Sequence, residues 1–209
     1  MAPITSISLP EVSSPTPLLD AALLRCDDVC TRRLVRELDE SDHALADHGA
    51  GVAALAVAVG RRLRFGTERL ETLCRAALLH DAGKRLLPPD LLAKPGPLSA
   101  PERRVVEGHA GVGSLVLLQE GLLSEASIVR HHHERWDGAG YPDRLRGEEI
   151  PLESRIILVA DTFDAMTSDR PYRVALSHET ALEEIRRGAG SQMDPACVAV
   201  ALDILGAAC

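Results

Sequence analysis

Apolar residues recur at helical spacing along almost the whole chain. From about Leu18 to the C-terminus the sequence is rich in Ala and Leu, and the apolar positions fall three and four residues apart. A convincing run of alternating apolar and polar residues, which would indicate a half-buried strand, is not found. The sequence therefore predicts an all-α fold, a compact helical bundle without an internal repeat.

Capping and turn residues divide this pattern into separate helices. Ser99-Ala100-Pro101-Glu102 has the form of a capping box with an early proline. Gly83 and the pair Pro88-Pro89 are expected to stop the helix before them. The irregular segment 134–151 has a length that is usually reserved for function. Helices are expected over about 18–39, 42–64, 67–81, 100–118, 122–133 and 152–168, with two more that begin after Ser177 and at Asp194-Pro195.

The chain is long enough for one domain with a short extension. Residues 1–17 contain four prolines and several Ser and Thr residues, which predicts a disordered N-terminal lead. Residues 18–40 are expected to form an N-terminal helix or an arm that contacts a signalling partner or forms a homodimer. Residues 41–209 would then form the main domain.

Charge and apolar runs exclude several classes of partner. The formal net charge of −8 argues against a binder of nucleic acid polymers, although a small anionic ligand needs only local positive charge. No apolar run is expected to span a bilayer, and residues 1–17 lack the pattern of a signal peptide. The five cysteines are widely scattered, and the pair Cys26 and Cys30 is expected to be unbridged. We therefore expect a cytoplasmic protein without a membrane partner.

Three adjacent histidines, His131, His132 and His133, run into a loop that contains Gly140, Tyr141 and Pro142. Neutral imidazole is the commonest metal ligand among protein side chains. The chain has five aromatic residues of the Phe, Trp and Tyr types, and four of them fall between residues 136 and 172. This clustering predicts a metal site beside a shaped substrate wall, with Trp136 as an anchor that ties the loop to the bundle.

Other segments offer further metal ligands. His80-Asp81 ends an expected helix and is followed by Gly83 and Lys84, so two ligands and a cation lie close together. Taken alone, His48 and His109 would be read as core or surface histidines, but beside the other motifs we expect them to be ligands. Asp161 lies in an apolar helix, where a carboxylate is costly to bury unless it is paired or bound to metal. Asp164 lies three residues further on the same face and is expected to support it.

These motifs together resemble the HD-GYP family, metal-dependent phosphodiesterases of the HD superfamily. The resemblance covers about residues 40–205 and rests on His80-Asp81, on the segment from His132 through Pro142, and on the segment from Asp161 through Arg173. It implies an HD-type bundle with a functional Gly-Tyr-Pro loop. It also implies a role for Lys84 at the scissile phosphate, and cationic contacts of Arg170 and Arg173 with the nucleotide. Seven residues match the metal-ligand positions of the family: His48, His80, Asp81, His109, His132, His133 and Asp161.

The sequence departs from the family pattern at a few positions. Some members bind a third metal through a glutamate where this chain has Ala44, so we expect two metal ions. Met193 replaces a frequent aromatic residue, which we interpret as a packing change. His131 has no ligand role in the pattern and is expected to be a supporting or surface residue. Arg135, Arg144 and Arg146 are interpreted as solvated loop charges.

The resemblance implies hydrolysis of cyclic di-GMP to linear pGpG, with further cleavage to GMP left open. The mixed imidazole and carboxylate set suits iron or manganese. Asp81 is the natural bridging ligand, and a hydroxide shared by the two metals would attack the phosphodiester in line, with Lys84 adding positive charge. Gly140, Tyr141 and Pro142 would border the substrate. Two alternatives stay open, namely hydrolysis of another cyclic dinucleotide such as cyclic GMP-AMP, and a non-catalytic sensor of cyclic di-GMP.

Overall fold

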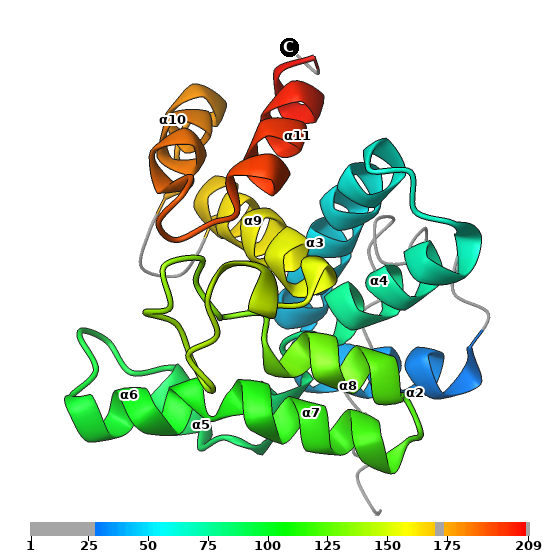
Figure 1. The fold of residues 1–209 in the computed structure, drawn as a ribbon. Helices are drawn as coiled ribbons and strands as arrows, with labels where there is room; N and C mark the ends of the chain where they lie inside the picture. Colours follow the sequence, from blue (N-terminus) through cyan, green and yellow to red (C-terminus); the bar gives the residue numbers. More distant parts are fainter. Residues whose placement is uncertain (1–27, 170–173, 208–209) are drawn as a thin grey trace, which may run out of the picture.

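The computed structural model describes residues 28–169 and 174–207 (Figure 1). These residues form helices joined by loops, and their only β pairing is an isolated bridge between Ala189 and Met193. The predicted all-α fold is therefore confirmed. The α-helices are α2 Val29–Ser41, α3 His43–Arg62, α4 Thr67–Leu79, α5 Pro89–Leu92, α6 Ala100–Glu107, α7 His109–Gln119, α8 Leu123–Arg130, α9 Leu152–Thr167, α10 His178–Gly188 and α11 Pro195–Gly206. Two 3-10 helices, η1 Ala82–Leu86 and η2 Gly147–Glu149, complete the elements.

Most predicted boundaries agree with the structure within two or three residues. The capping box is present, since the Ser99 side chain accepts from the Glu102 amide and the Glu102 carboxylate accepts from the Ser99 amide. Asp194 caps α11 in the same way by accepting from the amides of Ala196 and Cys197. The loop between α8 and α9 contains only the short η2. Capping chemistry was therefore a reliable guide to where helices begin.

Two predicted helices were wrong in extent. The single helix expected to about 118 is divided at Gly108 into α6 and α7, because a glycine constrains the backbone weakly and the His109 ring bonds the Val106 carbonyl in this turn. The helix expected to reach residue 133 ends at Arg130, so the histidine triplet follows the helix in a turn. The predicted lead 1–17, most of the predicted helix 18–39, and Cys26 lie outside the described residues.

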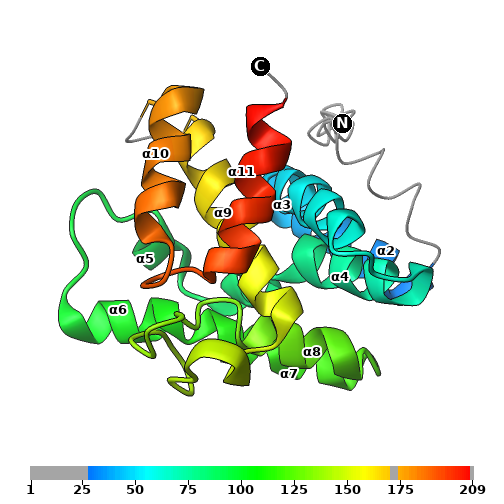
Figure 2. The same cartoon turned by 45° about the horizontal axis from the view of Figure 1, so that its top comes forward.

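Helix α3 is the central element of the bundle. It contacts α2, α4, α9 and α11, while α7 packs on α8 and η1 at one end and α10 packs on α9 and α11 at the other (Figures 1 and 2). By length and composition α3 could cross a membrane, contrary to our expectation that no run would qualify. Half of its most apolar window is buried inside the fold, however, as in the core helix of a globular domain. Because α3 has neighbours on several sides, the side chains that it directs toward them lie at the centre of the molecule.

The core is filled by aliphatic side chains. Leu73, Leu79, Ile156 and Ile157 are fully buried, as is much of the small Ala-rich face of α3. Met193 is 2% exposed and packs in the same cluster, which confirms that it fills space where an aromatic side chain was expected. Phe65 and Phe163 are partly buried and pack against this cluster, whereas Trp136 and Tyr141 are not part of it.

Gly83 marks the closest approach between two segments. A Cβ atom at this position would collide with the carbonyl oxygen of His109 and would lie 2.6 Å from the Gly113 nitrogen. Gly113 in α7 faces Gly83, because a Cβ atom at Gly113 would lie 3.2 Å from the Gly83 nitrogen, so the two glycines let η1 and α7 pack closely. This contact brings the end of α4 and the start of α7 together.

Candidate metal centre

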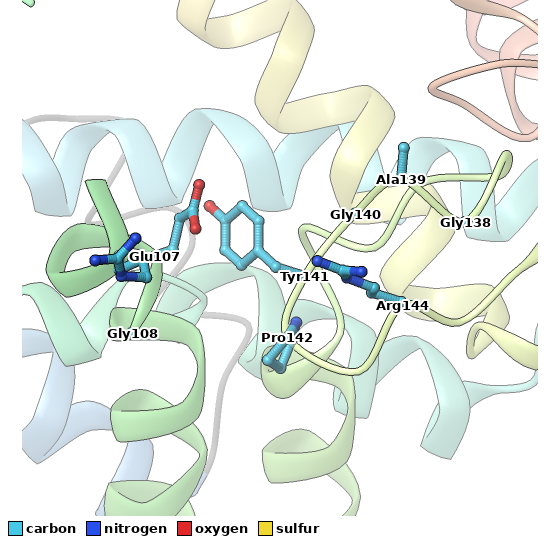
Figure 3. Close-up of a pocket in the computed structure, with 9 residues that line it drawn as sticks. Glu107, Gly108, Gly138, Ala139, Gly140, Tyr141, Pro142 and Arg144 are labelled. Carbon is cyan, nitrogen blue, oxygen red and sulfur yellow. The ribbon is translucent and has the colours of Figure 1, made fainter. Parts of the chain in front are cut away.

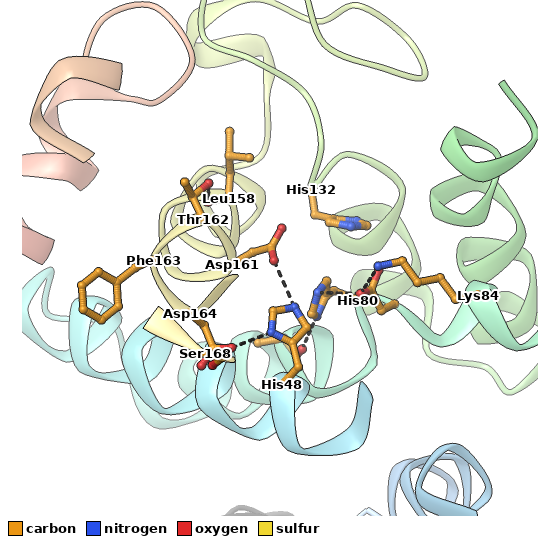
Figure 4. A network of polar contacts seen from close by, with 12 residues as sticks. His48, His80, Lys84, His132, Leu158, Asp161, Thr162, Phe163, Asp164 and Ser168 are labelled. Carbon is orange, nitrogen blue, oxygen red and sulfur yellow. Dashed lines mark hydrogen bonds and ion pairs between the residues drawn. The ribbon is translucent and has the colours of Figure 1, made fainter. Parts of the chain in front are cut away.

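The structure brings all seven predicted ligands together from five helices or their ends. Figure 4 shows His48, His80, His132 and Asp161 among them. His48 lies in α3 and Asp161 in α9. His80 and Asp81 follow the last residue of α4, and His109 is the first residue of α7. His132 and His133 lie in the turn after α8. The helices therefore converge on one buried centre, although their ligands are spread over more than a hundred residues of sequence.

The ligand atoms fall into two neighbouring groups. One contains Asp81, His109, His132 and His133, and the other contains His48, His80 and Asp161; in each group the ligand atoms lie within 4.8 Å of one another. Asp81 joins the groups. Its Oδ1 lies 3.2 Å from His109 Nε2 in the first group, and its Oδ2 lies 3.4 Å from His80 Nε2 in the second.

Three histidines are oriented by the same kind of hydrogen bond to the backbone. In each, the Nδ1–H group donates to the backbone carbonyl three residues earlier, at 2.6–2.8 Å. A carbonyl can only accept, so the proton lies on Nδ1 and the lone pair on Nε2. Backbone bonds of this kind are typical of histidines that bind metal through the other nitrogen. The pairs are His80 with Ala77, His109 with Val106, and His132 with Val129.

The bare Nε2 atoms point at other acceptors. His109 Nε2 lies 3.4 Å from His132 Nε2 and 3.2 Å from Asp81 Oδ1. His80 Nε2 and Asp81 Oδ1 are buried without a hydrogen-bond partner among the described residues. Converging buried lone pairs are costly unless a cation lies between them. The donor set therefore fits divalent metal ions.

Burial keeps the imidazoles of His132 and His133 in the neutral form that metal binding requires. Desolvation lowers the pKa of His133 to about 4 and places the pKa of His132 well below its ordinary value. Burial alone would raise the pKa of the Asp81 carboxyl, but the positive charge of Lys84 and the neighbouring histidines outweigh it and lower this pKa. At neutral pH His132 and His133 are therefore neutral, and Asp81 is a carboxylate.

His48 lies between two carboxylates. Its Nε2 is 3.0 Å from Asp161 Oδ1, and its Nδ1 is 2.6 Å from Asp164 Oδ2. Desolvation opposes a charge here, but the two hydrogen bonds outweigh it and raise the pKa of His48 to about 9. Asp164 also accepts from the Ser168 hydroxyl at 3.2 Å. Asp164 thus holds the imidazole from the side opposite to Asp161, in the place that the sequence predicted for a supporting residue.

Lys84 lies at the rim of the centre. Its ammonium group is 2.5 Å from Asp81 Oδ2, while its side chain remains 27% exposed. It can therefore reach a substrate that approaches from solvent without leaving the buried ligands.

The Gly-Tyr-Pro loop covers one side of the centre. A Cβ atom at Gly140 would lie 2.6 Å from both Glu134 Cα and the His133 carbonyl oxygen, so only glycine fits. The Tyr141 ring packs on the His133 ring, with the centroids 4.9 Å apart. Glu134 is 1% exposed and accepts from the Asp143 amide at 2.6 Å, which closes the loop on itself.

Two further contacts fix the same loop from outside. The Trp136 amide donates to the Gln192 carbonyl, and Arg155 lies over the Trp136 ring while it also pairs with Asp194, the cap of α11. Trp136 is therefore the anchor that the sequence predicted. His131 points to Asp143 and the Ser127 carbonyl, away from the seven ligands, so it supports the loop end only.

A pocket of about 720 Å³ lies beside the loop (Figure 3). Gly140, Tyr141 and Pro142 line it, as the sequence predicted for residues that border the substrate. Arg104, Glu107 and Arg144 line it too. The sequence does not predict these three, because helical spacing places Arg104 and Glu107 on a solvated face, and the loop context of Arg144 is that of a solvated charge. The predicted nucleotide contacts Arg170 and Arg173 lie outside the described residues.

Comparisons with known proteins agree with this geometry. A model of the HD domain family matches residues 32–197. RpfG of Xanthomonas campestris pv. campestris, named a cyclic di-GMP phosphodiesterase response regulator, is 39% identical over 173 residues, which cover 79% of this chain and 45% of the relative. The 3'3'-cGAMP-specific phosphodiesterase 3 of Vibrio cholerae is 36% identical over 194 residues, which cover 92% of this chain and 41% of the relative. The chain spans less than half the length of either relative.

Solved structures show the same fold. Bd1817 of Bdellovibrio bacteriovorus, described as an HD-GYP-type protein, superposes with a TM-score of 0.65 at 17% identity, covering 90% of this chain and 64% of that one. A cyclic GMP-AMP phosphodiesterase of Vibrio cholerae has the same TM-score at 22% identity, covering 85% and 48%. At such identities the likeness is evidence of the fold alone.

Proposed function

This chain belongs to the HD domain family, and from that premise we propose that it is a metal-dependent phosphodiesterase that hydrolyses cyclic di-GMP to linear pGpG. The observation that carries the proposal is the buried convergence of seven ligands beside a pocket that the Gly-Tyr-Pro loop lines. Five scattered cysteines and a net charge of −8 favour a cytoplasmic protein with a small-molecule substrate. A homodimer or a signalling partner would use the N-terminal region.

Two divalent ions would occupy the centre, with iron or manganese best suited to the mixed ligands. His109, His132 and His133 would hold one ion, and His48, His80 and Asp161 the other. Asp81 would contact both, since its two oxygens face different groups. Such a pair supplies a water nucleophile at neutral pH and positive charge for the phosphate oxygens.

The chain's own residues would position and stabilise the reacting phosphate. Lys84 would add a positive charge at the phosphate oxygens, because its ammonium group is held at the rim by Asp81. Tyr141, fixed by its packing on His133, would border the substrate. The protein fold around the ligands excludes bulk water, which strengthens each of these electrostatic contacts.

A direct assay tests the proposal. Protein loaded with Fe²⁺ or Mn²⁺ is incubated with cyclic di-GMP, and the products are separated by chromatography. We expect pGpG to accumulate and chelator to stop the reaction. Tight binding of cyclic di-GMP without turnover by metal-replete protein would instead support the non-catalytic sensor.

A second candidate substrate is 3'3'-cyclic GMP-AMP. It is favoured by the relative of Vibrio cholerae that aligns with 92% of this chain and is named for that substrate. The metal centre acts on a phosphodiester and does not itself distinguish the bases. The two substrates are compared by kcat/KM in one competition assay, and the larger value identifies the substrate class.

Removal of the Asp164 carboxylate is expected to weaken metal binding. In an Asp164→Ala variant the His48 ring loses the partner on Nδ1 that orients it. Losses of this kind lower metal affinity by roughly 10–100-fold. Competition with a chromophoric chelator measures the affinity for Mn²⁺. Asp203→Ala, which removes an exposed carboxylate paired with Arg62, is the control, and equal affinities of the two variants would contradict the orienting role.

A further inference from the structure

The pocket beside the loop carries two arginines without a described partner. Arg104 in α6 and Arg144 in the loop line it, and neither guanidinium makes a hydrogen bond or ion pair with another residue of the part that the structure describes. Neighbouring arginines differ, since Arg130 pairs with Asp143 and Arg135 with Asp137. Two open guanidinium groups on one pocket make a local positive site in a chain with a net charge of −8.

The backbone of Arg144 adds a second, independent observation. Its φ is +57°, in the left-handed region that favours glycine. A residue with a side chain is strained in this conformation, and strain of this kind concentrates at functional positions. Glycine would relieve the strain, yet the position holds a long cationic side chain that lines the pocket. Arg144 therefore places a guanidinium group at a position whose backbone conformation favours glycine.

The pocket adjoins the metal centre. Tyr141 lines it on one side and packs on the proposed ligand His133 on the other. Glu107 and Gly108 also line it and directly precede the proposed ligand His109. A ligand in the pocket therefore lies next to the group that is bound at the metal centre.

We propose that Arg104 and Arg144 bind the phosphate of the cyclic dinucleotide that is not being cleaved, an inference that rests on the proposed function. A cyclic dinucleotide has two phosphodiesters, so one must lie away from the centre when the other reacts. Guanidinium groups match phosphate oxygens with paired donors. Among the described residues Glu107 is the one carboxylate that lines the pocket, and it would face donor groups of a base or ribose.

Matched variants distinguish the loss of a phosphate contact from a change in the fold. Arg144→Gly removes the guanidinium and also relieves the backbone, so it keeps the fold. Arg64→Gly is its control, because Arg64 also has a positive φ, of 61°, and does not line the pocket. Arg104→Ala is compared with Arg186→Ala, an exposed helical arginine elsewhere. Thermal unfolding of each variant confirms that it is folded.

The readouts are kcat and KM for cyclic di-GMP and for bis(p-nitrophenyl) phosphate, which has a single phosphate. We expect Arg144→Gly and Arg104→Ala each to raise KM for cyclic di-GMP about ten-fold, with little change in kcat. Their kinetics with the single-phosphate substrate should match those of the wild type. The increase of KM with salt should also become less steep, because a charge contact has been lost.

Other outcomes distinguish a failure of this inference from a failure of the proposed phosphodiesterase function. Unchanged KM for cyclic di-GMP in Arg144→Gly and Arg104→Ala, with an active wild type, overturns the inference alone. An equal rise of KM in Arg64→Gly also overturns it, because the effect would then be one of general charge. A wild type that hydrolyses neither substrate overturns the proposed function. The arginines are then judged by affinity for a phosphorothioate analogue of cyclic di-GMP, which Arg144→Gly must weaken if the inference holds.

Discussion

Replacement of both His80 and Asp81 by alanine is expected to abolish turnover of cyclic di-GMP. The change removes one proposed ligand of each metal group, and Asp81 is the residue that faces both. Metal ions supply several kcal/mol of stabilisation to such reactions, so the loss should reach at least about a thousand-fold in kcat. Product formation with Mn²⁺-loaded protein measures it, and elemental analysis should find metal lost from the same sample.

The double variant is compared with His178→Ala plus Asp203→Ala. This control removes one imidazole and one carboxylate outside the metal centre, where His178 contacts the Leu205 carbonyl and Asp203 pairs with Arg62. We expect the control to keep wild-type activity. Full activity of the His80→Ala plus Asp81→Ala protein would falsify the proposed mechanism.

The Gly83→Ala variant is expected to be severely destabilised. Its methyl group would collide with the His109 carbonyl and would lie 2.6 Å from the Gly113 nitrogen. Backbone atoms cannot rotate away as a side chain can, so α7 would have to shift relative to η1. We expect a loss of roughly 3 kcal/mol or more in the free energy of unfolding. For a chain of this size that corresponds to a Tm about 6–12 °C lower.

Urea unfolding of metal-free protein measures this effect separately from metal binding. Gly206→Ala is the matched control, because nothing lies within 4 Å of a Cβ atom at that helical position. It should leave stability unchanged or raise it slightly, since alanine favours the helix more than glycine. A Gly83→Ala protein as stable as the Gly206→Ala protein would show that η1 and α7 are not packed as described.

The sequence allowed the helices and the ligands to be predicted, for different reasons. Apolar periodicity and caps such as Ser99 and Asp194 are local signals, so they predicted where most helices begin. Two helix ends were predicted wrongly, because Gly108 and the turn at His131 interrupt helices that the apolar pattern would continue. The ligands were predicted from the motifs around His80, the histidine triplet and Asp161 together with the family resemblance. No spacing rule brings His48 and Asp161 together.

Other features of the site depend on tertiary contacts, which no local sequence pattern indicates. Arg104 and Glu107 have the spacing of a solvated helix face, and only the fold of the loop over α6 makes them line a pocket. The strained backbone of Arg144 is likewise invisible in the sequence. Glu134 follows the histidine triplet directly, so a buried carboxylate there could have been suspected from its position. The hydrogen bond that Glu134 accepts from the Asp143 amide could not be predicted from the sequence.

In the proposed mechanism, this protein cleaves a cyclic dinucleotide with a bound metal pair. The most direct test of this mechanism is a titration of metal-free protein with Mn²⁺ or Fe²⁺ under anaerobic conditions, with pGpG formation from cyclic di-GMP measured at each step. We expect no product without metal and a rate that rises until two ions are bound per chain. If fully loaded protein binds cyclic di-GMP and leaves it intact, the proposed hydrolysis is wrong.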